Sequence, residues 1–187
     1  TENPMQENGP TLYKEEQREA RRMANYISEN ARKVTTTMLT EMKKQGQRIS
    51  MLTAYDYTMG GLVDRAGIDM ILIGDSASNV MAGNETTLPI TRDQMIYHAR
   101  SVARAAKHAL VVCDMPFGTY QVCTEDALRA AVRIMAESGV DAVKLEGGEP
   151  VIKTVKALVQ AGIPVCGHLG LTPQSVHVFG GFGLRAK

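Results

Sequence analysis

The sequence predicts an α/β fold built around a parallel β-sheet, and three observations favour this class. Between residues 49 and 169, apolar runs of strand length alternate with amphipathic helical patterns in five strand–helix repeats, and this alternation implies right-handed crossovers and a parallel sheet. The runs are almost continuously apolar, as in strands buried on both faces. Acidic residues directly follow two of the runs, at the strand ends where α/β proteins keep their active sites.

Length and composition limit which architectures and which classes of binding partner are expected. An eight-fold barrel typically takes about 250 residues, so five repeats in 187 residues indicate a barrel cut short or a smaller open sheet. The net charge of +1 gives no reason to expect nucleic acid or a charged membrane surface as partner. No apolar run approaches the roughly 20 residues that span a bilayer, and the N-terminus lacks the apolar core of a secretion signal.

The three cysteines form neither a CxxC pair nor a metal-binding spacing. This usage suits a reducing compartment, so we expect a cytoplasmic protein. Cys113 and Cys166 lie inside apolar runs and are expected to be small buried hydrophobes, whereas Cys123 falls in a loop.

Residues 1–33 are expected to form an extension that precedes a barrel domain over residues 34–187. Residues 1–12 are polar, carry two prolines and are predicted to be disordered. Residues 13–33 are dense in charge and suit a helix, either an arm that docks on a neighbouring subunit or a solvated helix.

The remaining elements follow in order. A helix is predicted over 34–47, a strand over 49–54, and a helix that Asp56 caps and Gly67 ends. After the strand over 70–76, which ends in a carboxylate and a hydroxyl, the connection over 77–90 is long enough to suggest a functional or disordered loop. Thr91 and Gln94 have the capping-box pattern at the start of the next helix. The later strands are predicted over 110–114, 142–146 and 164–169.

The two later helices have predicted caps and buried stripes. Thr124 is expected to cap one helix, which Gly139 ends, and Pro150 is expected to begin the other. Their predicted buried residues are Leu128, Ala131, Val132 and Met135 in the first helix, and Val151, Ile152, Val155, Leu158 and Val159 in the second.

Asp75 and Asp114 are the strongest pair of candidate chemical residues. Each comes at the end of an apolar run, and neighbouring strands lie about 4.8 Å apart, so the two carboxylates could share one cation if their strands are adjacent. Oxygen ligands without a His or Cys cluster favour Mg²⁺. Alternatively, one or both carboxylates cap a helix.

Four further residues are candidates for the site. Lys144 and Glu146 are two positions apart on one strand and therefore share a face, either as a substrate-facing pair or as a buried structural ion pair. Ser76 could bind metal or a substrate carboxylate, or cap the next turn. His168, near a strand end, could bind substrate or be structural.

Six segments taken together closely resemble the ketopantoate hydroxymethyltransferase family, in that family's order and spacing from about Lys33 to Lys187. These segments are Thr53–Tyr57, Gly74–Ser76, Thr86–Thr91, Asp114–Phe117, Val143–Glu149 and Gly167–Ser175.

The resemblance implies a (β/α)₈ TIM barrel of the phosphoenolpyruvate/pyruvate superfamily, with about the first five β/α units in this chain. It implies hydroxymethyl transfer from 5,10-methylenetetrahydrofolate to 2-oxoisovalerate, giving ketopantoate for pantothenate biosynthesis through a Mg²⁺-stabilised enolate. It also implies a homo-oligomer, which is a decamer in bacterial relatives.

The resemblance also implies roles for individual residues. Asp75 and Asp114 would hold Mg²⁺, with Glu146 behind them. Ser76 and Lys144 would contact the 2-oxo acid, and His168 would line the pocket. The family's general base is a glutamate on a later strand, so we expect that base beyond Lys187.

Two rival interpretations remain open at the level of the sequence. One is a Mg²⁺-dependent carbon–carbon lyase of the isocitrate lyase type, which needs a reactive cysteine loop, and Cys123 is the only loop cysteine in this chain. The other is a non-catalytic assembly partner that docks through residues 1–33. Stable association with an intact subunit, without bound Mg²⁺, would favour the second rival.

Overall fold

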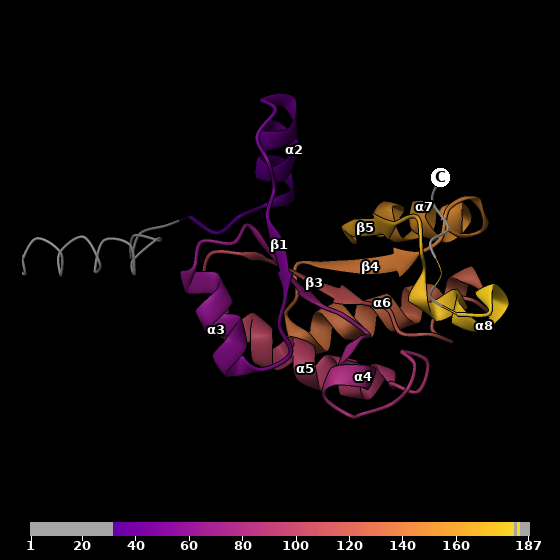
Figure 1. Cartoon of the computed structure of the whole chain (residues 1–187). Helices are drawn as coiled ribbons and strands as arrows, with labels where there is room; N and C mark the ends of the chain where they lie inside the picture. The colour runs from indigo at the N-terminus through magenta and orange to yellow at the C-terminus, as the bar shows by residue number, and fades with distance from the viewer. Residues whose placement is uncertain (1–31, 182, 184–187) are drawn as a thin grey trace, which may run out of the picture.

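The computed structural model describes residues 32–181 and 183, and its elements alternate as the sequence predicts (Figure 1). Helix α2 comes first, and β1, β2, β3, β4 and β5 then follow in turn. The strands are Met51–Thr53, Met70–Ile73, Leu110–Asp114, Ala142–Glu146 and Val165–His168. The helical elements are α2 (Thr36–Lys44), α3 (Tyr57–Arg65), α4 (Ala77–Val80), α5 (Arg92–Ala105), α6 (Thr124–Ser138), the 3₁₀ turn η1 (Glu149–Val151), α7 (Ile152–Gln160), the 3₁₀ turn η2 (Pro173–Ser175) and α8 (Val176–Phe179).

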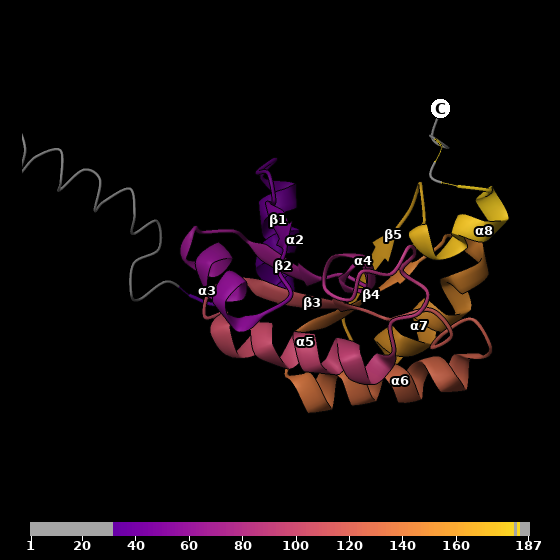
Figure 2. The same cartoon turned by 60° about the horizontal axis from the view of Figure 1, so that its bottom comes forward.

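The five strands form one parallel sheet in chain order, β1-β2-β3-β4-β5. Helices α3, α5, α6 and α7 pack side by side against one face of it, and Figure 2 shows α5 and α6 running along that face. Sequential parallel pairing with a helix in each crossover is the repeating unit of a (β/α) barrel. The predicted fold class is therefore confirmed.

Both faces of the central strands are buried, as their continuous apolar runs predict. Ile71, Val111 and Val143 belong to the larger core, which lies between the sheet and the helices. Leu110 and Val112 alternate with these residues and pack on the opposite face in a smaller cluster that includes Val34. Because side chains alternate along a strand, Asp114 at the end of β3 lies on this same second face.

Several helix boundaries follow the sequence signals. The Asp56 side chain accepts a hydrogen bond from the Met59 backbone N–H at 2.9 Å and caps α3. Thr91 and Gln94 form the reciprocal capping box at the start of α5. Gly139 ends α6 with a φ of 78°, a left-handed conformation that glycine adopts without a steric penalty.

Three local predictions are wrong. Cys123, not Thr124, occupies the cap position of α6, and its side chain makes no cap hydrogen bond. The connection over 77–90 is not entirely loop, because its first residues form α4. The helix expected from Pro150 begins instead with the 3₁₀ turn η1 and becomes α-helical at Ile152.

Two of the predicted buried stripes also need correction. Val132 is 53% exposed, and α6 buries Ala127, Ala130 and Ile134 beside Ala131 instead, because its packed face is turned toward both α5 and α7. In α7, Ile152 and Val159 are exposed, whereas Thr154 and Leu158 are buried. Apolar character alone did not identify the packed faces.

The predicted helix over 13–33 lies almost wholly outside the described residues. Within the described part of the chain, Val34 N–H donates to the His108 carbonyl at 2.7 Å, so the segment before α2 is joined to the start of β3. None of the helices described over 32–181 is long and apolar enough to cross a bilayer.

Candidate active site

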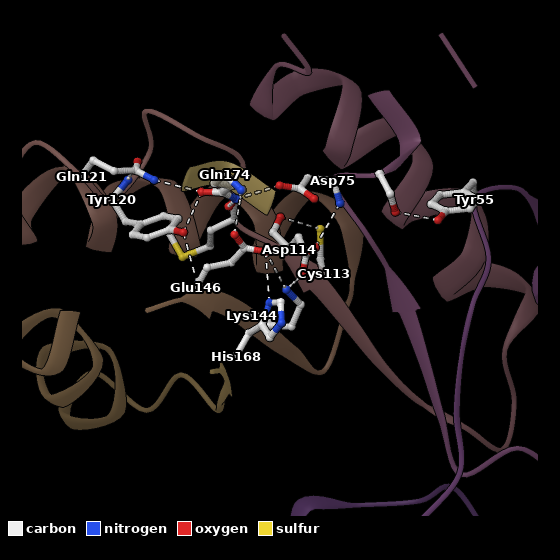
Figure 3. Close-up of polar contacts among 12 residues, drawn as sticks. Tyr55, Asp75, Cys113, Asp114, Tyr120, Gln121, Lys144, Glu146, His168 and Gln174 are labelled. Carbon is white, nitrogen blue, oxygen red and sulfur yellow. Dashed lines mark hydrogen bonds and ion pairs between the residues drawn. The ribbon is translucent and has the colours of Figure 1, made fainter. Parts of the chain in front are cut away.

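The predicted site residues lie together at the carboxyl ends of neighbouring strands (Figure 3). Asp114 ends β3, and its register partner on β4 is Lys144. Glu146 ends β4 opposite His168, the last residue of β5. Asp75 lies just beyond the end of the adjacent β2. The parallel register therefore brings four strand ends to one place.

Asp75 and Asp114 are in direct contact, as the adjacency of their strands predicts. The Asp75 backbone N–H donates to Asp114 Oδ2 at 3.0 Å. Neither carboxylate caps a helix, since Asp114 lies within a strand and the cap position of α4 is Ser76. The capping alternative is therefore wrong for both residues.

The turn that carries Asp75 is closely packed. A Cβ on Gly74 would lie 2.7 Å from Ser76 Oγ and 3.8 Å from Asp114 Oδ2. Glycine at this position leaves room for the Ser76 hydroxyl, which a Cβ would displace, whereas the contact with Asp114 would be an ordinary van der Waals distance.

Burial raises the pKa of both aspartates. The pKa of Asp114 rises to about 7, because desolvation outweighs the attraction of Lys144. Desolvation also raises the pKa of Asp75, against a hydrogen bond from Gln174 that lowers it. In both residues the charged form is therefore costly unless a cation lies close by.

Lys144 supplies one such cation. Its Nζ lies 2.8 Å from Asp114 Oδ1 and 3.9 Å from Glu146 Oε1. Burial lowers the pKa of Lys144, but Asp114, Glu146 and Asp75 together outweigh this effect and the pKa is raised overall, so the ammonium form is retained. The shared face predicted for Lys144 and Glu146 is the face opposite the helices.

Glu146 is held on both of its oxygens. Oε1 lies 3.1 Å from His168 Nδ1, and Oε2 accepts the Gln174 backbone N–H at 3.0 Å. Both of its oxygens therefore have protein partners, as both oxygens of Asp114 do through Lys144 and the Asp75 backbone N–H. The structure places His168 beside Glu146, where it is half-buried.

Ser76 is half-buried next to Asp75. Its Oγ lies 2.8 Å from the Tyr55 hydroxyl, and the Tyr55 carbonyl lies 2.7 Å from His98 Nδ1. Tyr55 therefore orients Ser76, and His98 holds the backbone from which Tyr55 extends.

Sequence reasoning missed three residues of the site: Tyr55, Tyr120 and Gln174. Tyr55 and Gln174 fall within the segments that carry the family resemblance, which was the available signal. Tyr120 lies in the loop after β3 and had no local signal. Its hydroxyl is 2.6 Å from Gln174 Oε1, a contact between residues 54 positions apart.

The side chains fit a hard divalent cation. Three carboxylates, those of Asp75, Asp114 and Glu146, face the single ammonium of Lys144, and a bound dication would offset the remaining negative charge. Over the described residues no group of three or more His, Cys, Asp or Glu side chains is arranged to hold a metal. A pair of carboxylates is the protein contribution that Mg²⁺ commonly takes, with water and substrate as its other ligands.

The cysteines lie outside this arrangement of ligands. All three are free thiols. Cys113 is buried as predicted, and burial raises its pKa well above the usual range, so it remains a neutral thiol. Cys166 is only partly buried, in contrast to the prediction, because β5 is one of the two edge strands of the described sheet.

The fold resembles two solved structures. A 2,3-dimethylmalate lyase of the PEP mutase/isocitrate lyase superfamily superposes with a TM-score of 0.54 at 17% identity, over 72% of this chain and 52% of that chain. A putative phosphonomutase from Burkholderia cenocepacia superposes with a TM-score of 0.52 at 17% identity, over 65% of this chain and 55% of the other. At these identities the likeness concerns the fold alone.

Comparison of the sequence with known proteins identifies the family, which the fold comparison does not. The 3-methyl-2-oxobutanoate hydroxymethyltransferase of Bacteroides thetaiotaomicron is 65% identical over 165 residues, which cover 88% of this chain and 60% of that relative. The protein of the same name from Flavobacterium johnsoniae is 64% identical over 156 residues, which cover 83% of this chain and 57% of that relative. The chain thus spans about three-fifths of the length of these relatives. The family model described as ketopantoate hydroxymethyltransferase matches residues 33–187, and the chain belongs to this family.

Proposed function

We propose that this chain binds Mg²⁺ and the 2-oxo acid 2-oxoisovalerate, as part of the transfer of a hydroxymethyl group from 5,10-methylenetetrahydrofolate that gives ketopantoate. The observation that carries the proposal is the contact of Asp75 with Asp114 beside Lys144, at the strand ends of a chain that belongs to this family. We extend the proposal to a role in pantothenate biosynthesis, which the family resemblance implies.

Asp75 and Asp114 would hold the cation, which supplies a Lewis acid that favours loss of the proton next to the keto group. Their raised pKa values support this assignment, because a buried carboxylate that is costly to ionise alone gains most from a bound dication. The family resemblance implies that Glu146 would support the cation without direct contact, and its two oxygens contact His168 and Gln174.

Lys144 would supply positive charge to the keto oxygen as negative charge develops there. Its Nζ is an ammonium held by Asp114 at 2.8 Å, in a site where both side chains are at most 10% exposed. A preorganised cation in such a low-dielectric site stabilises an oxyanion more than it would in water.

Ser76 and His168 would orient the substrate. The Ser76 hydroxyl, fixed by Tyr55, can donate a hydrogen bond to the substrate carboxylate. The half-buried His168, at the end of β5, lies on the open side of Glu146 and would line the pocket. We extend the proposal to a homo-oligomeric assembly in the cytoplasm, which rests on the family resemblance.

Binding of 2-oxoisovalerate to the 187-residue chain, measured by calorimetry with MgCl₂ or with EDTA, tests the proposal. We expect at least about a tenfold higher affinity with Mg²⁺, equivalent to about 1.4 kcal/mol, and loss of this difference in Asp114→Asn. Asp126→Asn is the matched control, because Asp126 lies on the surface of α6 and pairs with Arg129. Equal affinities with Mg²⁺ and with EDTA in the unmodified chain would contradict the proposal.

A further inference from the structure

Gln174 lies at the centre of the polar contacts in Figure 3, although it is neither charged nor a strand residue. It belongs to η2, between β5 and α8, and is 7% exposed. Its side chain and backbone together reach groups on three different segments that carry site residues. A buried amide that contacts three such segments indicates a role in positioning the site residues as well as in packing.

The orientation of the Gln174 carboxamide is fixed by the direction of its hydrogen bonds. The Glu146 backbone N–H, which can only donate, lies 3.2 Å from the Tyr120 hydroxyl oxygen. Tyr120 is therefore free to donate its own hydrogen to Gln174 Oε1, at 2.6 Å. Gln121 Nε2 donates to the same oxygen at 2.9 Å.

With Oε1 occupied by two donors, Nε2 must face two acceptors. It donates to Asp75 Oδ2 at 2.8 Å and to the Met115 carbonyl at 3.0 Å. A flipped amide would set its NH₂ against the donors Tyr120 and Gln121, and its oxygen against two acceptors. Each hydrogen-bonding position of the side-chain amide is used once, so only one orientation satisfies the buried groups.

We propose that Gln174 is a positioning residue for the cation site, and that the hydroxyl of Tyr120 sets its orientation. The Gln174 amide holds Oδ2 of Asp75, which would leave Oδ1 for the cation, while its backbone N–H holds Glu146. This inference rests on the proposed function, because it assigns Asp75 as a cation ligand. Gln174 acts through Asp75 and Glu146, and no contact with substrate is assigned to it.

A Mg²⁺ titration of the 187-residue chain tests this inference without any measurement of turnover. MgCl₂ affinity is measured by calorimetry for the unmodified chain, Gln174→Met, Tyr120→Phe and Asp64→Asn. Gln174→Met keeps the length of the side chain and removes both the donor and the acceptor. We expect it to weaken Mg²⁺ binding about 10- to 100-fold, the usual range for partners that orient a metal ligand.

Tyr120→Phe keeps the ring and removes only the hydroxyl that fixes the amide. One of the two donors to Gln174 Oε1 is then lost while Gln121 remains, and we expect Mg²⁺ binding about 3- to 10-fold weaker, as for the loss of one buried hydrogen bond. Asp64→Asn is the control for general destabilisation, since it disturbs a buried carboxylate that accepts backbone N–H groups before β3, at the other end of the sheet. Its Mg²⁺ affinity should stay within about twofold of the unmodified chain.

The outcomes separate the two proposals. If the unmodified chain binds Mg²⁺ and folded Gln174→Met binds it within twofold as tightly, the positioning role is overturned and the proposed function stands. If Gln174→Met does not fold, Tyr120→Phe decides, and an unchanged affinity in that variant overturns the role. If the unmodified chain binds no Mg²⁺, the proposed function fails and this inference fails with it.

Discussion

The two ends of the sheet use buried and half-buried carboxylates in different ways. Before β3, Asp64 accepts backbone N–H groups of Lys107, His108 and Ala109 at 2.7–3.0 Å. Before β2, Asp69 accepts both the backbone N–H and the hydroxyl of Ser50, each at 2.7 Å. These carboxylates connect loops to one another at the amino ends of the strands.

At the carboxyl ends the aspartates are held mainly by other polar side chains. Asp75 takes its side-chain hydrogen bond from Gln174, and Asp114 pairs with Lys144 and takes a single backbone N–H. Both of these aspartates have raised pKa values because burial dominates. We infer that a carboxylate that accepts several backbone N–H groups stabilises the fold. A buried carboxylate that is costly to ionise is instead available to bind a ligand.

The largest effect on stability is expected at the amino end. Asp64→Asn would set an NH₂ group against a backbone N–H in a site that is 5% exposed, and we expect the free energy of unfolding to fall by about 2 to 3 kcal/mol. Urea denaturation measures this change. A loss below about 0.5 kcal/mol would show that the carboxylate does not maintain this end of the sheet.

At the carboxyl end, replacing an aspartate by asparagine is expected to raise the stability of the fold instead of lowering it. The folded-state pKa of Asp75 lies above its reference value of 3.8, so the protonated form favours folding and the charged form costs stability. In EDTA, the stability of the unmodified chain should therefore fall as pH rises from about 4 through the raised pKa. Asp75→Asn, which carries no charge, should be more stable than the unmodified chain at pH 8.

Two further measurements sharpen the prediction for Asp75→Asn. The difference between the variant and the unmodified chain should shrink as the pH falls toward and below the reference pKa of 3.8, because protonation removes the buried charge. Addition of Mg²⁺ should stabilise only the unmodified chain, because binding to the folded state alone raises stability. A variant that is less stable in EDTA at pH 8 would contradict the distinction between the two ends.

The smallest effect is expected at an exposed ion pair of the amino end. Lys33 Nζ lies 2.9 Å from Asp141 Oδ2, with side chains 38% and 35% exposed, and donates to the Ala109 carbonyl at 2.7 Å. Lys33→Met should lower stability by about 0.5 to 1 kcal/mol. The loss should shrink in about 1 M salt, which screens the pair, and thermal unfolding at two salt concentrations measures it.

The sequence predicted the parts of the fold that depend on local pattern. Continuous apolar runs identified the strands, and Asp56, Thr91 and Gly139 marked helix ends through hydrogen bonds or backbone conformations set within a few residues. The buried stripes of α6 and α7 were harder to predict. Val132 and Val159 are apolar but exposed, because the packed face of a helix depends on which neighbouring helices it meets.

The candidate site likewise contains residues that local pattern predicted and residues that it missed. Asp75, Asp114 and Lys144 were found because they stand at or near the ends of apolar runs, and a parallel sheet brings such ends together. Gln174 and Tyr120 were missed because their importance lies in a contact across 54 positions of sequence. An uncharged amide in a loop has no pattern of its own until the fold places it between two carboxylates.

The most direct test of the central claim uses Mn²⁺ in place of Mg²⁺ and 2-oxoisovalerate labelled with ¹⁷O at its keto and carboxylate oxygens. If the cation held by Asp75 and Asp114 also binds the 2-oxo acid, the electron paramagnetic resonance lines of the bound Mn²⁺ should broaden with the labelled acid and not with the unlabelled one. Asp114→Asn should abolish the signal of bound Mn²⁺. Bound Mn²⁺ whose lines are the same with labelled and unlabelled acid would contradict the account.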